Sequence, residues 1–122
     1  PDLPRVTCER NKVQQVVLNL LRNGAYAMSL PDDNRNPTFV IRLKRDGEMA
    51  RIEVEDNGAG MDDDVRKRVF EPFFTTKAEG IGTGLGLSVS YFIITENHRG
   101  TMEVTSAPGR GTTFIIRLPL EL

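Results

Sequence analysis

Hydrophobic and polar residues along this chain follow two different periods, and each change of period marks a new element. Residues 51–56 alternate polar and apolar side chains with the period of two that is typical of a half-buried strand, and residues 38–45 and 49–56 are predicted to be two strands that join into a hairpin across Asp46-Gly47. Residues 10–29 repeat apolar side chains at helical spacing. By the same reasoning, the pattern predicts further strands at 5–8, 101–106 and 112–118, and further helices at 62–70 and 85–97.

This set of elements predicts an α+β fold. Helices that pack on one face of a largely antiparallel sheet give a two-layer sandwich, here with a mixed sheet of about five strands and three helices on one face. The apolar stripe of the first helix predicts the side that meets the sheet, and it consists of Val13, Val16, Val17, Leu20, Gly24 and Ala27.

Length and composition predict a single domain over residues 1–122 and narrow its partners. Of the 122 residues 39% are hydrophobic, which is enough for one core, and the formal charge of −1 gives no field for gathering nucleic acid. The longest apolar runs are too short to span a bilayer, so we expect no direct membrane contact. Cys8 has no partner for a disulfide and is expected to be a buried thiol, which fits a cytoplasmic location.

The chemistry of the chain centres on Asp56, which closes a predicted strand and is followed by glycines at 58 and 60. A buried carboxylate needs a donor, and the exocyclic amino group of adenine is one, whereas guanine has a carbonyl oxygen at that place. Gly58 and Gly60 let backbone approach a flat ring closely. A plain turn between two elements is the alternative interpretation of the same residues.

Three amides on the first helix form a second candidate feature. Gln15, Asn19 and Asn23 lie four residues apart, so they share one face, on the side opposite the apolar stripe. The carboxamide oxygen of Asn23 is a suitable ligand for Mg²⁺, although a solvated polar face explains the pattern equally well. The acids at 62–64 favour a helix cap over a metal site.

A third feature is the glycine-rich run at residues 80–87, which leads directly into a predicted helix. Free backbone N–H groups at a helix start bind anions, so the run is suited to phosphate. It matches neither the Gly-Lys-Ser/Thr loop nor the dinucleotide fingerprint, and a flexible hinge is the alternative.

Four motifs occur together in a fixed order, and they resemble the N, first-glycine, F and second-glycine boxes of sensor histidine kinases. The motifs are Asn19-Leu20-Leu21-Arg22-Asn23-Gly24, Asp56-Asn57-Gly58-Ala59-Gly60-Met61, Glu71-Pro72-Phe73-Phe74-Thr75-Thr76-Lys77 and Gly82-Thr83-Gly84-Leu85-Gly86-Leu87, with Gly109-Arg110-Gly111-Thr112-Thr113-Phe114 as the closing strand motif. The chain resembles the ATP-binding catalytic domain of such kinases, which implies the Bergerat fold shared with gyrase, heat-shock chaperone and mismatch-repair ATPases.

The resemblance implies a role for each matching residue. Asp56 would accept from adenine, Asn23 would coordinate Mg²⁺, and Asn19 and Lys77 would act at the phosphates as the catalytic pair. The loop at 71–83 would form a lid over the nucleotide. The residues that the resemblance places against ATP are Asn19, Asn23, Asp56, Gly58, Gly60, Met61, Phe74, Thr76, Lys77, Gly82, Thr83, Gly84, Leu85, Gly86 and Thr112.

One substitution within the resemblance bears on the reaction. The ATPases of the superfamily have a glutamate four residues before the magnesium asparagine, and this chain has Asn19 there. A carboxamide is no general base at neutral pH, so we expect slow hydrolysis and transfer of the γ-phosphoryl group to a protein instead. Tyr26 and Arg99 depart from the common pattern, where many relatives have a basic residue and a glycine.

The resemblance also implies partners. They are ATP, the dimerisation and phosphoacceptor domain of the same kinase, which would be a homodimer that can be anchored in a membrane, and a response regulator in a two-component phosphorelay. His98 is the chain's one histidine and is expected to complete a helix end rather than accept phosphate. A regulatory nucleotide-binding module without transfer, and an anti-sigma-type serine kinase, are the alternative functions.

Overall fold

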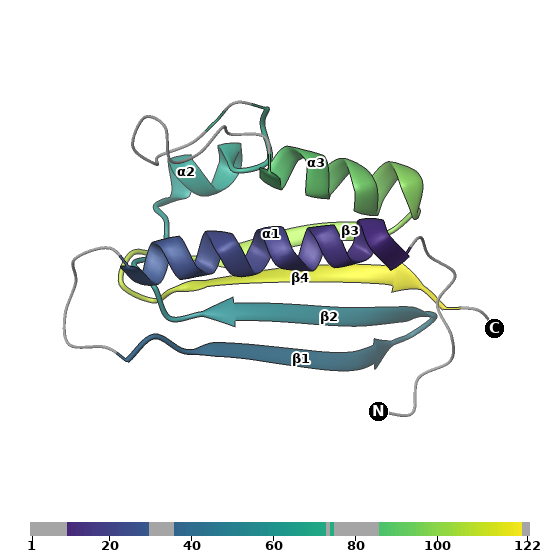
Figure 1. The fold of residues 1–122 in the computed structure, drawn as a ribbon, viewed down its shortest axis with the longest axis horizontal. Coiled ribbons are helices and arrows are strands. Elements are labelled where there is room, and N and C mark those ends of the chain that lie inside the picture. The colour runs from purple at the N-terminus through teal and green to yellow at the C-terminus, as the bar shows by residue number, and fades with distance from the viewer. Residues whose placement is uncertain (1–9, 30–35, 73, 75–85, 121–122) are drawn as a thin grey trace.

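The computed structural model describes residues 10–29, 36–72, 74 and 86–120, and it forms two layers (Figure 1). The predicted strand at 5–8 and Cys8 lie outside the described residues. In chain order the elements are α1 (Arg10–Ser29), β1 (Phe39–Asp46), β2 (Met49–Asp56), α2 (Asp63–Arg68), α3 (Gly86–Phe92), a π-helical turn η1 (Ile93–Asn97), β3 (Thr101–Ser106) and β4 (Thr112–Pro119). This confirms the α+β fold with three α-helices.

The four described strands form one sheet in the order β1-β2-β4-β3, and every neighbouring pair is antiparallel. The β1–β2 hairpin turns at Gly47 and Glu48, because Asp46 still pairs with Met49. At the opposite end of the sheet Asp56 is paired with Thr112 of β4. The register therefore brings the end of β2 beside the start of β4.

The helices cover one face of this sheet. Val16 and Leu20 of α1 are at most 1% exposed and pack with Val54 of β2 and Phe114 of β4. Ile94, at the start of the π-helical turn, is fully buried in the same cluster. The predicted stripe of α1 is therefore the side that packs on the sheet, with Val13, Val17 and Ala27 half-buried at its margins.

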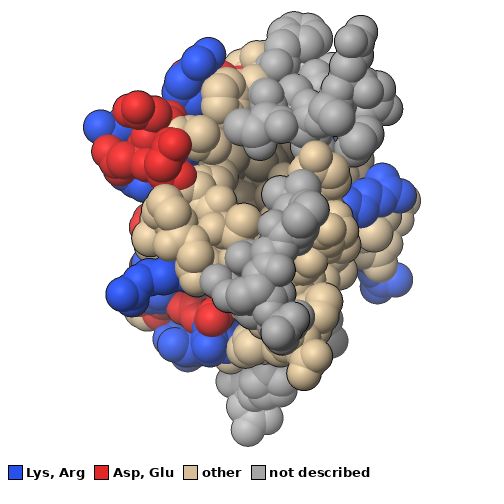
Figure 2. Space-filling view, turned by 90° about the vertical axis from the view of Figure 1, so that its left-hand side faces the viewer, with Lys and Arg blue, Asp and Glu red and all other residues tan. Residues whose placement is uncertain are grey.

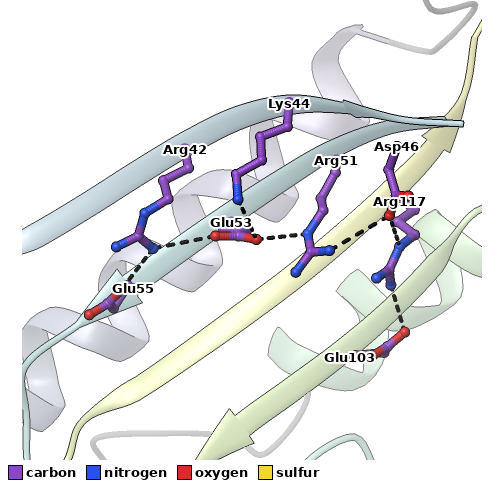
Figure 3. A network of polar contacts seen from close by, with 8 residues as sticks. All are labelled: Arg42, Lys44, Asp46, Arg51, Glu53, Glu55, Glu103 and Arg117. Carbon is purple, nitrogen blue, oxygen red and sulfur yellow. Dashed lines mark hydrogen bonds and ion pairs between the residues drawn. The ribbon is translucent and has the colours of Figure 1, made fainter.

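Charged side chains occupy the other face of the sheet, as Figure 3 shows. Glu53 of β2 lies at their centre: its Oε1 is 3.3 Å from Nη1 of Arg42, and its Oε2 is 2.7 Å from Nε of Arg51 and 3.8 Å from Nζ of Lys44. The Arg51 contact is an ion pair without hydrogen-bond alignment, since the buried Nε has no hydrogen-bond acceptor. The Glu53 side chain is 8% exposed. Three cations thus enclose one carboxylate.

The acids that precede α2 form a cap, as predicted. Asp62 is the N-cap residue, and its Oδ1 accepts from the Val65 N–H at 2.9 Å. Asp63 pairs with Arg66 and Lys67 on the same helix, and these contacts hold the pKa of Asp63 below its usual value. The acids therefore stabilise a helix start.

The predicted helix at 85–97 is α-helical only as far as Phe92. The next turn widens to π-helical geometry, and two groups beyond it bind its carbonyls: Nδ1 of His98 lies 2.9 Å from the Ile93 carbonyl oxygen, and the Gly100 N–H donates to the Ile94 carbonyl at 2.8 Å. Since a carbonyl only accepts, Nδ1 of His98 carries the proton. His98 is buried at 9% exposure and completes the helix end, as the sequence predicts.

Candidate functional site

Asp56 lies buried at the end of β2, where the sheet meets α1. It is 4% exposed, and its Oδ1 accepts from the Gly58 N–H at 2.9 Å. A Cβ on Gly24 of α1 would lie 3.1 Å from Oδ2 of Asp56, so helix and carboxylate are in near contact. Burial raises the pKa of Asp56, and the backbone N–H groups of Gly58 and Thr112 partly counter the rise. A buried carboxylate that makes so few hydrogen bonds suits an external donor.

The loop after Asp56 is held against the turn between β3 and β4. Gly60 has φ +76°, and a Cβ there would lie 2.0 Å from the Ala107 carbonyl oxygen, so only glycine fits. The Met61 N–H donates to Oγ of Ser106 at 2.8 Å. Backbone geometry by itself therefore requires a glycine at position 60.

Ser106 is a supporting residue that sequence analysis missed. Its hydroxyl donates to the Gly111 carbonyl at 2.8 Å and lies 2.9 Å from Oγ1 of Thr112. Because the Ser106 hydrogen is used on Gly111, the Thr112 hydroxyl is the donor in the second bond. Ser106 thus connects the loop at 58–61 to Thr112, which is 5% exposed and lies beside Asp56 in the sheet register. A serine at a strand end carries no signal that sequence alone reveals.

The contacts of Asn57 agree with the alternative interpretation of this stretch as a turn between two elements. Its Oδ1 accepts from the Thr38 N–H at 2.9 Å, and its Nδ2 donates to the Asn36 carbonyl at 2.8 Å. The side chain between Asp56 and the glycines thereby fixes the entry to β1.

The helical spacing predicts that Asn19 and Asn23 lie on the side of α1 opposite the core, and this is wrong. Both residues lie on the flank of the helix. Asn19 and Asn23 are half-buried, whereas Gln15 is exposed. Nδ2 of Asn19 lies 3.1 Å from Oγ of Ser90 and 3.4 Å from the Gly86 carbonyl oxygen, so Asn19 faces the start of α3. The reason is that α3 packs beside α1 and covers part of that flank.

The site therefore extends along α1. Asp56 lies beside Gly24, and Gly86 lies beside Asn19, five residues or about 7.5 Å away along the helix axis. Asn23 lies between these two places, and its carboxamide takes part in no hydrogen bond within the described residues. Two motifs far apart in sequence are thus aligned along one helix.

The motifs at residues 71–77 and 82–87 are described only in part. Phe74 is half-buried, and the Arg68 guanidinium lies 4.5 Å from its ring centroid. Thr76, Lys77, Gly82, Thr83, Gly84 and Leu85 fall outside the described residues, as does most of the expected lid.

The described residues contain no cluster of three or more His, Cys, Asp or Glu side chains that could hold a metal ion. Mg²⁺ is a hard cation that is often bound by one or two protein oxygens together with water and phosphate, and the carboxamide oxygen of Asn23 is of the type that it accepts.

Figure 2 shows the end of the molecule at which the site lies. Where grey atoms leave the surface visible, uncharged residues occupy its middle and Lys, Arg, Asp and Glu side chains lie around the periphery.

None of the described helices is long and apolar enough to cross a membrane.

Sequence comparison identifies the family. The profile described as "Histidine kinase-, DNA gyrase B-, and HSP90-like ATPase" matches residues 8–122. The chain belongs to this family. Among curated relatives, Sporulation kinase E of Bacillus subtilis (strain 168) is 44% identical over 98% of the chain, and the histidine-protein kinase AtoS of Escherichia coli (strain K12) is 42% identical over 98%. The chain spans 15% and 18% of the lengths of these two proteins.

Solved structures lead to the same family. The catalytic domain of the histidine kinase ThkA superposes with a TM-score of 0.78 at 30% identity, covering 94% of the chain and 70% of the ThkA structure. Full-length ShkA in complex with AMPPNP matches with a TM-score of 0.79 at 26% identity, over 97% of the chain and 23% of ShkA. The resemblance to histidine kinase catalytic domains that the four motifs indicated is therefore confirmed.

Proposed function

We propose that this domain binds Mg-ATP and donates the γ-phosphoryl group to a histidine on a separate dimerisation domain. The observation that carries the proposal is the carboxylate of Asp56: it is 4% exposed, and the donors that reach it within the described residues are backbone N–H groups, that of Gly58 at 2.9 Å and that of Thr112. An adenine amino group is a donor that would stabilise it, whereas the carbonyl oxygen of guanine would face it unfavourably. Binding of AMPPNP by the matching ShkA is consistent with an adenine nucleotide here.

The phosphates are assigned to the other end of the α1 flank, near Asn19 and Gly86. Asn23 lies one helical turn from Asn19, and its carboxamide oxygen is uncommitted among the described residues, so it fits a Mg²⁺ ligand. Bound Mg²⁺ would neutralise charge on the phosphate oxygens as the phosphoryl group leaves. Lys77 and the glycines at 82 and 84 are proposed to meet the phosphates as well, with residues 71–83 as the lid.

We propose transfer over hydrolysis because Asn19 stands where the related ATPases have glutamate. Its amide can position groups at the phosphates but cannot remove a proton from water at neutral pH. The acceptor is assigned to another domain, since His98 is buried and its Nδ1–H is engaged by Ile93. By itself, then, the domain is expected to bind ATP without phosphorylating itself.

The wider assignment follows from the same relatives. AtoS is named as a signal transduction histidine-protein kinase and is several times longer than this chain. We infer that the domain works within a homodimeric cytoplasmic kinase core whose phosphate passes to a response regulator.

Incubation of the domain with its own dimerisation domain and γ-labelled ATP tests the reaction. Acid-labile, base-stable phosphate on the partner is expected, because phosphohistidine has this stability. Acid-stable phosphate would assign a serine kinase instead, and nucleotide binding without any transfer would assign a regulatory module.

A further inference from the structure

Ser90 is a buried polar residue that none of the family motifs includes. It lies in α3 and is 0% exposed. Its hydroxyl donates to the Gly86 carbonyl oxygen at 2.8 Å, four residues back on the same helix. A serine hydroxyl has one hydrogen, and a backbone carbonyl cannot donate, so this bond uses the only hydrogen that Ser90 has. Toward any other group Oγ of Ser90 can act only as an acceptor.

That constraint fixes which end of the Asn19 amide faces α3. The Asn19 side-chain atom that lies 3.1 Å from Oγ of Ser90 must be a donor, and the same atom lies 3.4 Å from the Gly86 carbonyl oxygen, which also only accepts. Both neighbours therefore require the amide nitrogen, Nδ2, at this place. The carbonyl oxygen, Oδ1, is directed elsewhere and takes part in no hydrogen bond within the described residues.

We propose that Ser90 is a positioning residue that holds Asn19 with its amide nitrogen on α3 and its carbonyl oxygen free for the cation side of Mg-ATP. This inference rests on the proposed function. Phosphate oxygens accept hydrogen bonds and do not donate them, so an oxygen cannot bind them directly. Asn19 then meets the triphosphate through Mg²⁺ or through water in its shell, and not as an N–H donor.

The contact also couples two motifs. Gly86 is the last glycine of the second-glycine box and the first residue of α3, and Asn19 opens the N box on α1. The Ser90 hydroxyl bonds to both residues. Its removal is therefore expected to affect the metal-dependent part of nucleotide binding and to spare the adenine end, where Asp56 and Gly58 lie.

Calorimetric titration with ADP, in EDTA and again in Mg²⁺, tests this in the 122-residue domain. For wild type, S90A, N19A and the double variant, the ratio of the two dissociation constants gives the magnesium enhancement. S90A is expected to keep the metal-free affinity within about twofold and to lose about three- to tenfold of the enhancement, the value of one or two hydrogen bonds. In the N19A background, S90A should change nothing further, because the two residues act as one unit.

Thr95→Val provides the matched control. Oγ1 of Thr95 donates to the Tyr91 carbonyl at 2.7 Å, so this variant removes the same kind of four-residue bond, but in the next turn and away from Asn19. It is expected to retain the full magnesium enhancement. The ¹H–¹⁵N signals of the Asn19 side-chain NH₂ group give a readout without ligand: they should move toward solvent-exposed values in S90A and stay in place in T95V.

The outcomes separate the two proposals. A wild-type domain that binds no ADP in either buffer would overturn the proposed function. A wild-type domain that binds, together with an S90A variant of unchanged magnesium enhancement or unchanged Asn19 NH₂ signals, would overturn the role of Ser90 alone. So would independent, additive effects of S90A and N19A.

Discussion

Glu53 offers the sharpest test of how the open face of the sheet is stabilised. Its side chain is 8% exposed, while the three cations around it, Arg42, Lys44 and Arg51, are 40%, 55% and 28% exposed. Glu53→Gln keeps the size of the side chain but removes the charge that all three cations share (Figure 3). The variant thus isolates the electrostatic contribution of one buried carboxylate.

The expected loss of stability in Glu53→Gln depends on how deeply Glu53 and its three cations are buried. Removing one partner of a fully buried pair costs about 3–5 kcal/mol, because the other charge is left without compensation. Here the cations can turn to water, so the expected loss is smaller, about 1–2 kcal/mol, which lowers Tm by about 4–8 °C. Glu55 is the matched control: it contacts the same Arg42 at 2.7 Å but is 40% exposed, and Glu55→Gln should cost less than about 0.5 kcal/mol.

The shifted pKa of Glu53 determines how the stabilisation by this residue changes with pH. Burial by itself would raise the pKa of Glu53, but the charges of Lys44 and Arg51 and the contacts from Arg51 and Arg42 outweigh it and leave the pKa below its ordinary value of 4.5. A lowered folded-state pKa means that the stabilisation is complete above pH 4.5 and is lost as pH falls through the lower value. The cost of Glu53→Gln should therefore be full at pH 7 and shrink toward pH 3.

Urea unfolding of wild type, Glu53→Gln and Glu55→Gln at pH 7 and at pH 3 measures these differences. Equal costs for the two variants would refute the argument from burial. A Glu53→Gln cost that is the same at both pH values would refute the assignment of a depressed pKa.

Two further predictions concern a helix end and the metal. Arg99 has φ +55°, a conformation that favours glycine, so Arg99→Gly should raise the free energy of unfolding by about 0.5–1 kcal/mol. Gly100→Ala should lower it by more than about 2 kcal/mol, because the new Cβ would lie 2.1 Å from the Arg117 carbonyl oxygen. Thermal melts that rank these two variants the other way would contradict the geometry. Asn23→Ala should abolish the magnesium dependence of nucleotide binding and leave the fold intact, and an undiminished enhancement in calorimetry would reject Asn23 as a ligand.

Much of the fold could be predicted from the sequence because its elements carry strong local signals. The helix at 10–29 and the strands at 49–56 and 101–106 agree with the structure at both ends. The widening of the last helix after Phe92 could not be predicted, since it depends on where His98 and Gly100 donate their hydrogen bonds. The geometry of this turn is therefore set by its hydrogen-bond partners and not by the helix propensity of its residues.

Some features of the candidate site could likewise be predicted from the sequence, and others could not. Asp56 could be located because a strand end, a carboxylate and two glycines coincide in one short stretch. The orientation of Asn19 could not, because it depends on a hydroxyl 71 residues away. Helical spacing placed Asn19 and Asn23 on one face, but only the packing of α3 shows that this face is a partly covered flank.

Binding of ATP and GTP to the wild-type domain and to Asp56→Asn, titrated by calorimetry in Mg²⁺, decides whether Asp56 recognises adenine. We expect the wild-type domain to bind ATP and to discriminate against GTP, and Asp56→Asn to lose about 1–3 kcal/mol of ATP affinity, the difference between a charged and a neutral acceptor in a dry site. Equal affinity of the wild-type domain for ATP and GTP, or an Asp56→Asn variant that is folded by circular dichroism and binds ATP as tightly as wild type, would contradict it.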